Sequence, residues 1–158
     1  MKKYCLIYLL FLIGCSYNQD TRFEKKIVIG FSQCTMVDEW RKTMVEEMQR
    51  EISFYRNYNI TFIVKDAHDD NNQQIKDIRD LIQHGINLLI VSPNEAQQLT
   101  STVEDVYDRG IPVIVIDRKI NSSKYTAYIG GDNLSIGNEA GYFAEELLKG
   151  KGNILEIS

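Results

Sequence analysis

Side chains that could bind a polar ligand stand where a short apolar run ends. Asp117 and Arg118 directly follow the apolar residues 112–116. A carboxylate accepts hydrogen bonds from hydroxyl groups, and a guanidinium donates them in a fixed planar fork. The pair therefore suits a polyol whose neighbouring hydroxyls both donate and accept. The alternative is an ion pair that closes the end of a strand.

A second group of polar residues follows the apolar run at residues 27–31. From this group we predict five ligand contacts: Ser32, Gln33, Asp38, Trp40 and Arg41. Trp40 is the only tryptophan of the chain, and a rigid aromatic face packs well against the C–H face of a sugar ring. The alternative for Trp40 is a core residue that begins the apolar stripe of a helix.

Other chemistry finds little support in the residues. His68 and His84 are too isolated for a metal site, and His84 before a glycine is typical of a helix C-terminus. Asp70 favours a helix cap, and Cys34 has no histidine close to it in sequence. No nucleophile elbow, phosphate loop, zinc spacing or dinucleotide fingerprint is present. We therefore expect a binding module rather than an enzyme, with no metal and no cofactor.

Short apolar segments predict the strands that must position these side chains. They lie at residues 27–31, 60–64, 88–91, 112–116, 126–129 and 154–157. Single helices between strands imply right-handed crossovers and a parallel sheet. Ligands of such sheets bind beyond the carboxyl ends of the strands, where the polar residues stand. The fold class is therefore α/β, a doubly wound parallel sheet of Rossmann-like type.

Stretches of helical period fill the gaps between the strands. Asp70 and Gln73 have the form of a capping box that opens one helix, and Gly85 ends it. Pro93 and Asn94 predict the start of the next helix. A further helix begins at residue 132 or 133.

Composition and charge narrow the class of protein. The chain has 158 residues, of which 44% are hydrophobic and 25% charged, so it is long enough for one domain with a core. The net charge is −4, and no basic patch appears that would favour nucleic acid as a partner.

The N-terminus predicts export. Two lysines precede the apolar residues 4–13, which are too few to span a bilayer as a helix. Residues 1–15 therefore predict a secretory signal peptide. Residues 12–15 resemble the bacterial lipobox, which implies that Cys15 is lipidated and becomes the mature N-terminus; the alternative is an ordinary leader. Residues 16–26 would form a polar tether, and the protein would lie in the periplasm or cell envelope, anchored to the membrane.

From residue 26 onward the chain resembles the amino-terminal lobe of type I periplasmic sugar-binding proteins, the ribose-binding and LacI-like superfamily. The resemblance rests on residues 27–33, 38–40, 111–118 and 128–133. It implies that Asp117 and Arg118 bind sugar hydroxyls, that Trp40 stacks on the ring and that Asp38 is a polar partner. Arg41 stands where ribose-type members have a second aromatic residue.

The chain is similar, more specifically, to the extracellular sensor domains of hybrid two-component regulators from gut Bacteroidetes. Residues 32–34, 38–41, 69–71, 91–96 and 117–119 carry this similarity. It implies a sugar sensor that acts on a histidine kinase domain. The lipobox favours instead a free lipoprotein that delivers sugar to an ABC transporter permease. An exported α/β enzyme is the third possibility.

Members of this family hold sugar between two lobes. The resemblance therefore assigns residues 27–150 to one lobe and residues 151–158 to the start of a second, so that the chain is a fragment or the product of a truncated gene. The expected partners are a small sugar, the membrane through the lipid anchor or a parent transmembrane segment, and a kinase domain or permease. A lobe by itself would bind free sugar weakly, because water competes for every hydrogen bond.

Overall fold

Five parallel strands form one sheet in a computed structural model that describes residues 26–155. The order across the sheet is β2-β1-β3-β4-β5. The strands are β1 (Ile27–Gln33), β2 (Ile60–Asp66), β3 (Leu88–Ser92), β4 (Val113–Ile116) and β5 (Ala127–Ile129). All four strand pairings are parallel, as the sequence predicted.

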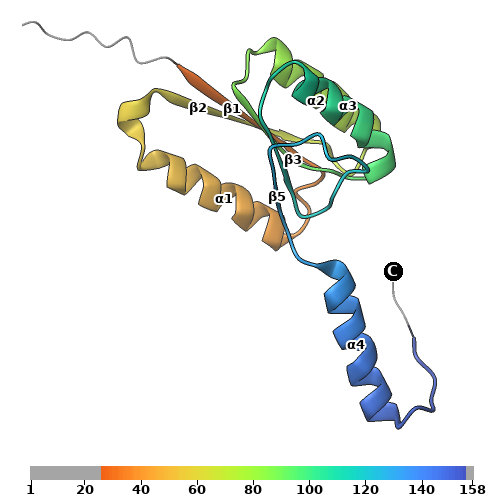
Figure 1. The fold of residues 1–158 in the computed structure, drawn as a ribbon. Helices are drawn as coiled ribbons and strands as arrows, with labels where there is room; N and C mark the ends of the chain where they lie inside the picture. Colours follow the sequence, from red (N-terminus) through yellow and green to blue (C-terminus); the bar gives the residue numbers. More distant parts are fainter. Residues whose placement is uncertain (1–25, 156–158) are drawn as a thin grey trace, which may run out of the picture.

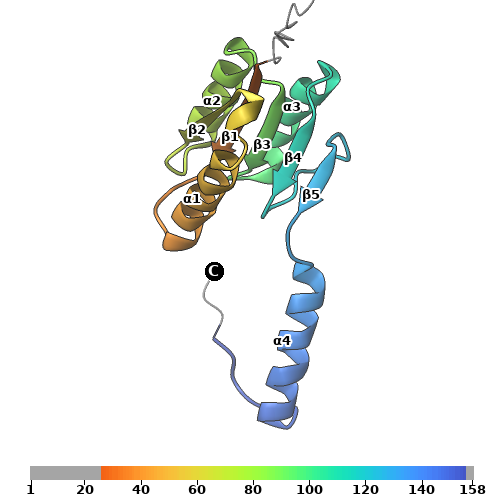
Figure 2. The ribbon, with the colours of Figure 1, turned by 90° about the vertical axis from the view of Figure 1, so that its left-hand side faces the viewer.

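Helices cover both faces of the sheet (Figures 1 and 2). The helices of the structure are α1 (Glu39–Ser53), α2 (Asn71–Gln83), α3 (Ala96–Asp108) and α4 (Asn133–Leu148), with a 3-10 turn, η1 (Arg56–Tyr58), after α1; the first three cover the sheet. Helix α1 lies on one face, and α2 and α3 lie together on the other. The predicted doubly wound α/β class is therefore confirmed.

Two apolar layers hold the sheet between the helices. On the face of α2 and α3, completely buried side chains such as Ile78, Leu81 and Leu99 pack on the strands. On the opposite face, Val45 of α1 packs on Phe31 and Ile116 of the sheet in a smaller cluster. Burial on both faces explains why the central strands are apolar almost throughout.

The residues predicted to begin and end α2 do so in the structure. The Asp70 carboxylate accepts hydrogen bonds from the amides of Asn72 and Gln73 and so caps α2. The other half of the capping box does not form, because the backbone amide of Asp70 donates to the carbonyl of Ala67 and the Gln73 side chain donates to Asp77. Gly85, with φ of +71°, follows the end of α2.

Helix α3 begins two residues later than Pro93 and Asn94 predict. Its first residue is Ala96, and Glu95 caps it without a side-chain hydrogen bond. Asn94 stays in the loop because its amide donates to the buried Gln74 side chain and its own side chain donates to the carbonyl of Asp69. These tertiary contacts outweigh the local preference for a helix start.

Helix α4 stands apart from the sheet (Figures 1 and 2). Asp132 caps it by accepting from the amide of Ser135, yet none of its residues is buried. Its exposed apolar side chains are Leu134, Ile136, Tyr142, Phe143 and Leu147. The packed part of residues 27–150 thus ends with β5. The strand expected from residue 154 is not present at residues 154 and 155, and its last two residues lie outside the described part, as do the predicted signal peptide and Cys15.

Within residues 26–155, no helix is both long enough and apolar enough to cross a bilayer.

Candidate functional site

The carboxyl ends of the strands bring polar residues from distant parts of the chain to one edge of the sheet. In the register, Gln33 at the end of β1 lies opposite Asp66 in β2 and Ser92 in β3. Asp117 follows β4 directly. The edge is therefore the place that the sequence predicted for ligand binding.

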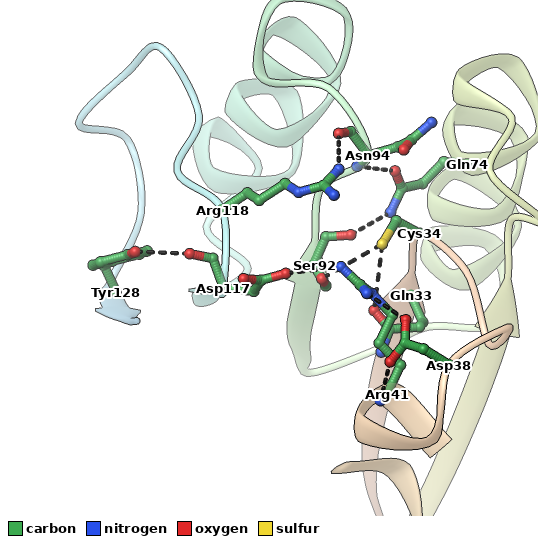
Figure 3. A network of polar contacts seen from close by, with 10 residues as sticks. All are labelled: Gln33, Cys34, Asp38, Arg41, Gln74, Ser92, Asn94, Asp117, Arg118 and Tyr128. Carbon is green, nitrogen blue, oxygen red and sulfur yellow. Dashed lines mark hydrogen bonds and ion pairs between the residues drawn. The ribbon is translucent and has the colours of Figure 1, made fainter. Parts of the chain in front are cut away.

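A row of ion pairs between Asp38, Arg41 and Asp117 crosses this edge (Figure 3). The two terminal nitrogens of the Arg41 guanidinium contact different carboxylates: Nη1 lies 2.5 Å from Oδ2 of Asp38, and Nη2 lies 3.1 Å from Oδ2 of Asp117. The Arg41 side chain is only 14% exposed, so these ion pairs are partly shielded from water. Asp38 also caps α1 by accepting from the amide of Arg41.

Two members of this row of ion pairs, Asp38 and Arg41, have shifted pKa values. Hydrogen bonds from the backbone amide and then the guanidinium of Arg41 hold the pKa of Asp38 below its usual value. Burial acts to lower the pKa of Arg41, but its partners, Asp38 first among them, raise it overall. Both groups are therefore ionised at neutral pH.

Asp117 has an unusual backbone. Its φ is +63°, in the left-handed region that few non-glycine residues adopt. Its amide donates to the carbonyl of Ile129 at 2.9 Å, and its carbonyl accepts from the hydroxyl of Tyr128 at 2.8 Å. Two residues of β5 thus hold the peptide groups on both sides of the Asp117 side chain.

Arg118 points away from Asp117 (Figure 3). It is exposed, and its Nη1 donates to the carbonyl of Asn94 at 2.7 Å. The alternative of an ion pair between Asp117 and Arg118 is therefore wrong for this structure, in which Asp117 pairs with Arg41 instead. Arg118 keeps further guanidinium donors for a ligand.

Trp40 lies at the surface beside Asp117. It is 56% exposed, which removes the alternative that it is a core residue. It lines a hollow of about 290 Å³ together with Asp117. The other lining residues are Met44, Met48, Ile116, Ile129, Gly130 and Gly131. The Trp40 ring and the Asp117 carboxylate thus line the same hollow. The Arg41 guanidinium lies 5.5 Å from the centroid of the Trp40 ring.

Two residues that the sequence predicted as ligand contacts are not exposed to solvent. The side chains of Ser32 and Gln33 are completely buried, next to Cys34, which is also buried. The Cys34 sulfur lies 3.8 Å from Oε1 of Gln33 and 3.8 Å from Oγ of Ser92. These residues form a polar floor beneath the exposed rim. A ligand that rests on the rim in this structure does not reach Ser32 or Gln33.

Sequence reasoning missed one residue that organises the site. Gln74 of α2 is completely buried; its Nε2 donates to the carbonyl of Ser92 and its Oε1 accepts from the amide of Asn94, both at 2.9 Å. Gln74 therefore holds the loop that contains Asn94, whose carbonyl accepts a hydrogen bond from Arg118. A signal was available, since Gln74 stands at helical spacing with the apolar Ile78 and Leu81.

Metal chemistry gains no support from the described part of the chain. Among residues 26–155, no group of three or more His, Cys, Asp or Glu side chains could hold a metal ion. His68 contacts Asp66 at 3.1 Å near the surface, and His84 is the residue that caps the end of α2, as predicted.

A comparison with protein families decides the class. The model of a periplasmic binding protein domain matches residues 29–158, which is most of the chain. The chain belongs to the periplasmic binding protein family. The resemblance noted in the sequence is therefore confirmed.

Relatives of this periplasmic binding protein domain are longer than the chain itself. The ribose import binding protein RbsB of Bacillus subtilis is 29% identical over 129 residues, which cover 82% of this chain and 41% of that protein. The D-xylose-binding periplasmic protein of Haemophilus influenzae is 26% identical over 134 residues, which cover 82% of this chain and 38% of that protein. The chain thus spans about two fifths of these relatives.

Solved structures show the same relation. The fructose-binding periplasmic domain of the hybrid two-component system BT1754 is 46% identical, with a TM-score of 0.76 over 80% of this chain and 41% of that one. An ABC transporter solute-binding protein from Mycobacterium smegmatis with bound glycerol is 28% identical, with a TM-score of 0.68 over 78% of this chain and 41% of that one. These relatives are binding proteins by their names.

Proposed function

We propose that this periplasmic binding protein domain forms part of a receptor for a neutral sugar. One observation carries the proposal: at the carboxyl edge of the sheet, two carboxylates and two guanidiniums stand beside an exposed indole. The formal charges of Asp38, Arg41, Asp117 and Arg118 sum to zero. Such an edge offers both donors and acceptors without attracting a charged ligand.

The proposed mode of binding follows from the directions of these groups. The Asp117 carboxylate accepts from sugar hydroxyls, and the free donors of Arg118 bind hydroxyl or ring oxygens. Trp40 packs against the C–H face of the sugar in the hollow that it shares with Asp117. Arg41 holds the Asp117 carboxylate in place, so less side-chain freedom is lost when sugar binds.

We propose that the complete site includes a second lobe, which the longer relatives have room for, and that this lobe closes over the same edge and excludes water. Closure of two lobes around a ligand is a common way to bury polar contacts. The chain alone would therefore bind free sugar with a dissociation constant of about 1 mM or weaker.

We further propose that the parent protein is the sensor of a hybrid two-component system. The 46% identity to the fructose-binding periplasmic domain of the hybrid two-component system BT1754 supports this role. The similarity to transporter-binding proteins at 28–29% identity supports the alternative, delivery of sugar to an ABC permease. The DNA that follows codon 158 discriminates between them: a second lobe followed by a kinase supports the sensor, and a second lobe followed by a stop codon supports the transporter.

Lipidation of Cys15 is a separate proposal, supported by the lipobox-like residues 12–15. In a bacterial host, a radioactive fatty acid should label the chain and the Cys34→Ser variant but not the Cys15→Ser variant. Label that survives in the Cys15→Ser variant would remove the lipid anchor and leave an ordinary leader.

The sugar site itself is tested by titrating the full chain with fructose, ribose, xylose and glucose, followed by NMR. We expect shifts that concentrate on the Trp40 indole and on the guanidiniums of Arg41 and Arg118. Asp117→Asn should remove them. Asp105→Asn is the matched control, because Asp105 forms an exposed ion pair with Arg109 on α3, away from the site.

Two results would overturn parts of this proposal. If none of the neutral sugars shifts these signals even at about 100 mM, a hundred times the tightest dissociation constant expected for the chain alone, the sugar site is wrong. If a sugar binds the chain alone with micromolar affinity, the site is complete here and needs no second lobe.

A further inference from the structure

Asp117 owes its position to two residues of β5. Directly after β4 the chain enters the left-handed region at Asp117, with φ of +63°. An L-residue other than glycine adopts this region only at a cost, because its Cβ approaches the neighbouring carbonyl. The amide of Asp117 is bound by the carbonyl of Ile129, and its carbonyl is bound by the hydroxyl of Tyr128.

The direction of the Asp117 side chain depends on this backbone. With φ of +63°, the carboxylate reaches across to α1, where Oδ2 accepts from Nη2 of Arg41 at 3.1 Å (Figure 3). A return to the common negative φ would rotate Cβ about the chain and turn the carboxylate away from Arg41. The Tyr128 hydroxyl lies on the opposite side of Asp117 from Arg41, so it acts on the carboxylate only through the backbone.

Gly130 leaves the space that this contact needs. A Cβ at position 130 would lie 2.1 Å from the hydroxyl oxygen of Tyr128 and 2.9 Å from the carbonyl oxygen of Asp117. Real side chains essentially never approach so closely. The Tyr128 ring is also held by the ammonium of Lys119, which lies 4.8 Å from its centroid. An alanine at position 130 would therefore force the ring out of its contact with Asp117.

We propose that Tyr128 is a positioning residue of the sugar site: its hydroxyl, passing over Gly130, keeps Asp117 in the left-handed conformation that aims the carboxylate at Arg41 and at the ligand. This rests on the proposed function as far as the ligand is concerned. The effect on the Arg41–Asp117 pair does not depend on it.

The test uses the full chain labelled with ¹⁵N. The guanidinium signal of Arg41, assigned with Arg41→Lys, reports the ion pair, and Asp117→Asn gives its position when the pair is weakened. We expect Tyr128→Phe to move this signal toward the Asp117→Asn position and to weaken sugar binding by about two- to tenfold, as the loss of one hydrogen bond does. Tyr107→Phe is the matched control, because Tyr107 lies partly exposed on α3.

A second set of variants tests the role of Gly130. Gly130→Ala should displace the Arg41 signal as Tyr128→Phe does. In the Tyr128→Ala background the same change should have a smaller effect, because the ring that it would strike is absent and only the 2.9 Å approach to the Asp117 carbonyl oxygen remains. An equal effect of Gly130→Ala in both backgrounds would show that Gly130 acts by another route and would overturn the proposed arrangement.

The outcomes separate the two proposals. If the Arg41 signal is unchanged in Tyr128→Phe while the parent chain binds sugar, the positioning role is wrong and the function stands. If the signal moves as expected but the parent chain binds no sugar, the positioning role stands and the function is wrong. If Tyr128→Phe prevents folding, the hydroxyl is a general structural element rather than a local device, which also overturns the proposal.

Discussion

Replacing Gln74 by methionine should destabilise the protein and loosen the loop that binds Arg118. Gln74 is completely buried, and its amide group joins the carbonyl of Ser92 to the amide of Asn94. Methionine has a similar length but neither donates nor accepts as an amide does. The variant therefore leaves one backbone acceptor and one backbone donor without these partners, beneath a layer that water does not reach.

The magnitude follows from these two groups. An unsatisfied buried polar group costs about 1–3 kcal/mol, so we expect the free energy of unfolding to fall by about 2–6 kcal/mol. A domain of this kind is stable by about 5–15 kcal/mol in total. Gln98→Met is the control, because the Gln98 amide bonds to Glu95 on the exposed surface of α3. It should change stability by less than about 0.5 kcal/mol.

The assay is urea unfolding of the full chain, followed by circular dichroism and by Trp40 fluorescence. We expect the midpoint for Gln74→Met to fall with little change in slope, and the guanidinium signal of Arg118 to shift because Asn94 no longer holds its carbonyl in place. A loss of stability below about 1 kcal/mol, or a loss equal to that of Gln98→Met, would refute the role assigned to Gln74.

Gln74→Glu adds a dependence on pH. A protonated carboxyl can donate to Ser92 and accept from Asn94, whereas the ionised form cannot donate. Burial and this donation raise the folded-state pKa of the introduced carboxyl above its unfolded value of about 4.3. Its stabilisation is therefore complete below about pH 4.3 and lost as pH rises through the folded pKa. A variant whose stability rises over that range would contradict the two-bond geometry.

Two further variants test the helix caps. Asp70→Ala should lower the free energy of unfolding by about 1 kcal/mol, while Asp70→Asn should cost much less because the amide oxygen still accepts from Asn72 and Gln73; equal losses in urea unfolding would show that these two hydrogen bonds do not account for the stabilisation. The pKa of Asp38 is held below its usual 3.8 by hydrogen bonds from Arg41, so its stabilisation is present above that value and is lost as pH falls through the folded pKa. The stability difference between the protein and Asp38→Asn, measured from urea midpoints, should therefore shrink on acidification, and a difference that grows would reverse the assigned sign.

The sequence alone determined the elements and the edge at which the site lies. Apolar runs and helical periodicity are local properties, and they report which face of each segment is buried. The capping carboxylate of Asp70 and the stop at Gly85 are local as well, because their partners lie within a few residues. The carboxyl-edge rule then followed from the parallel order alone, and it placed Asp117 and Arg118 correctly at that edge.

Tertiary structure decided which of these residues meet and which face solvent. Arg41 pairs with Asp117 across 76 positions of sequence, and this contact depends on the left-handed turn at Asp117 rather than on any pattern near Arg41. The same holds for Tyr128, whose hydroxyl reaches Asp117 only because Gly130 leaves room. Such contacts are set by strand register and backbone torsion, which periodicity does not encode.

Burial divided the predicted site residues in a way that residue type could not. Ser32 and Gln33 have the chemistry of ligand contacts but lie beneath the rim, while Trp40 has the chemistry of a core residue but is exposed. Helices on both faces of the sheet decide this, because Ser32 and Gln33 are consecutive residues of β1 and point to opposite faces, whereas Trp40 lies in the first turn of α1 and stays at the surface. The position of α4 is tertiary in the same sense: its sequence determines a helix with a good cap, but an apolar stripe by itself does not specify the surface on which the helix packs.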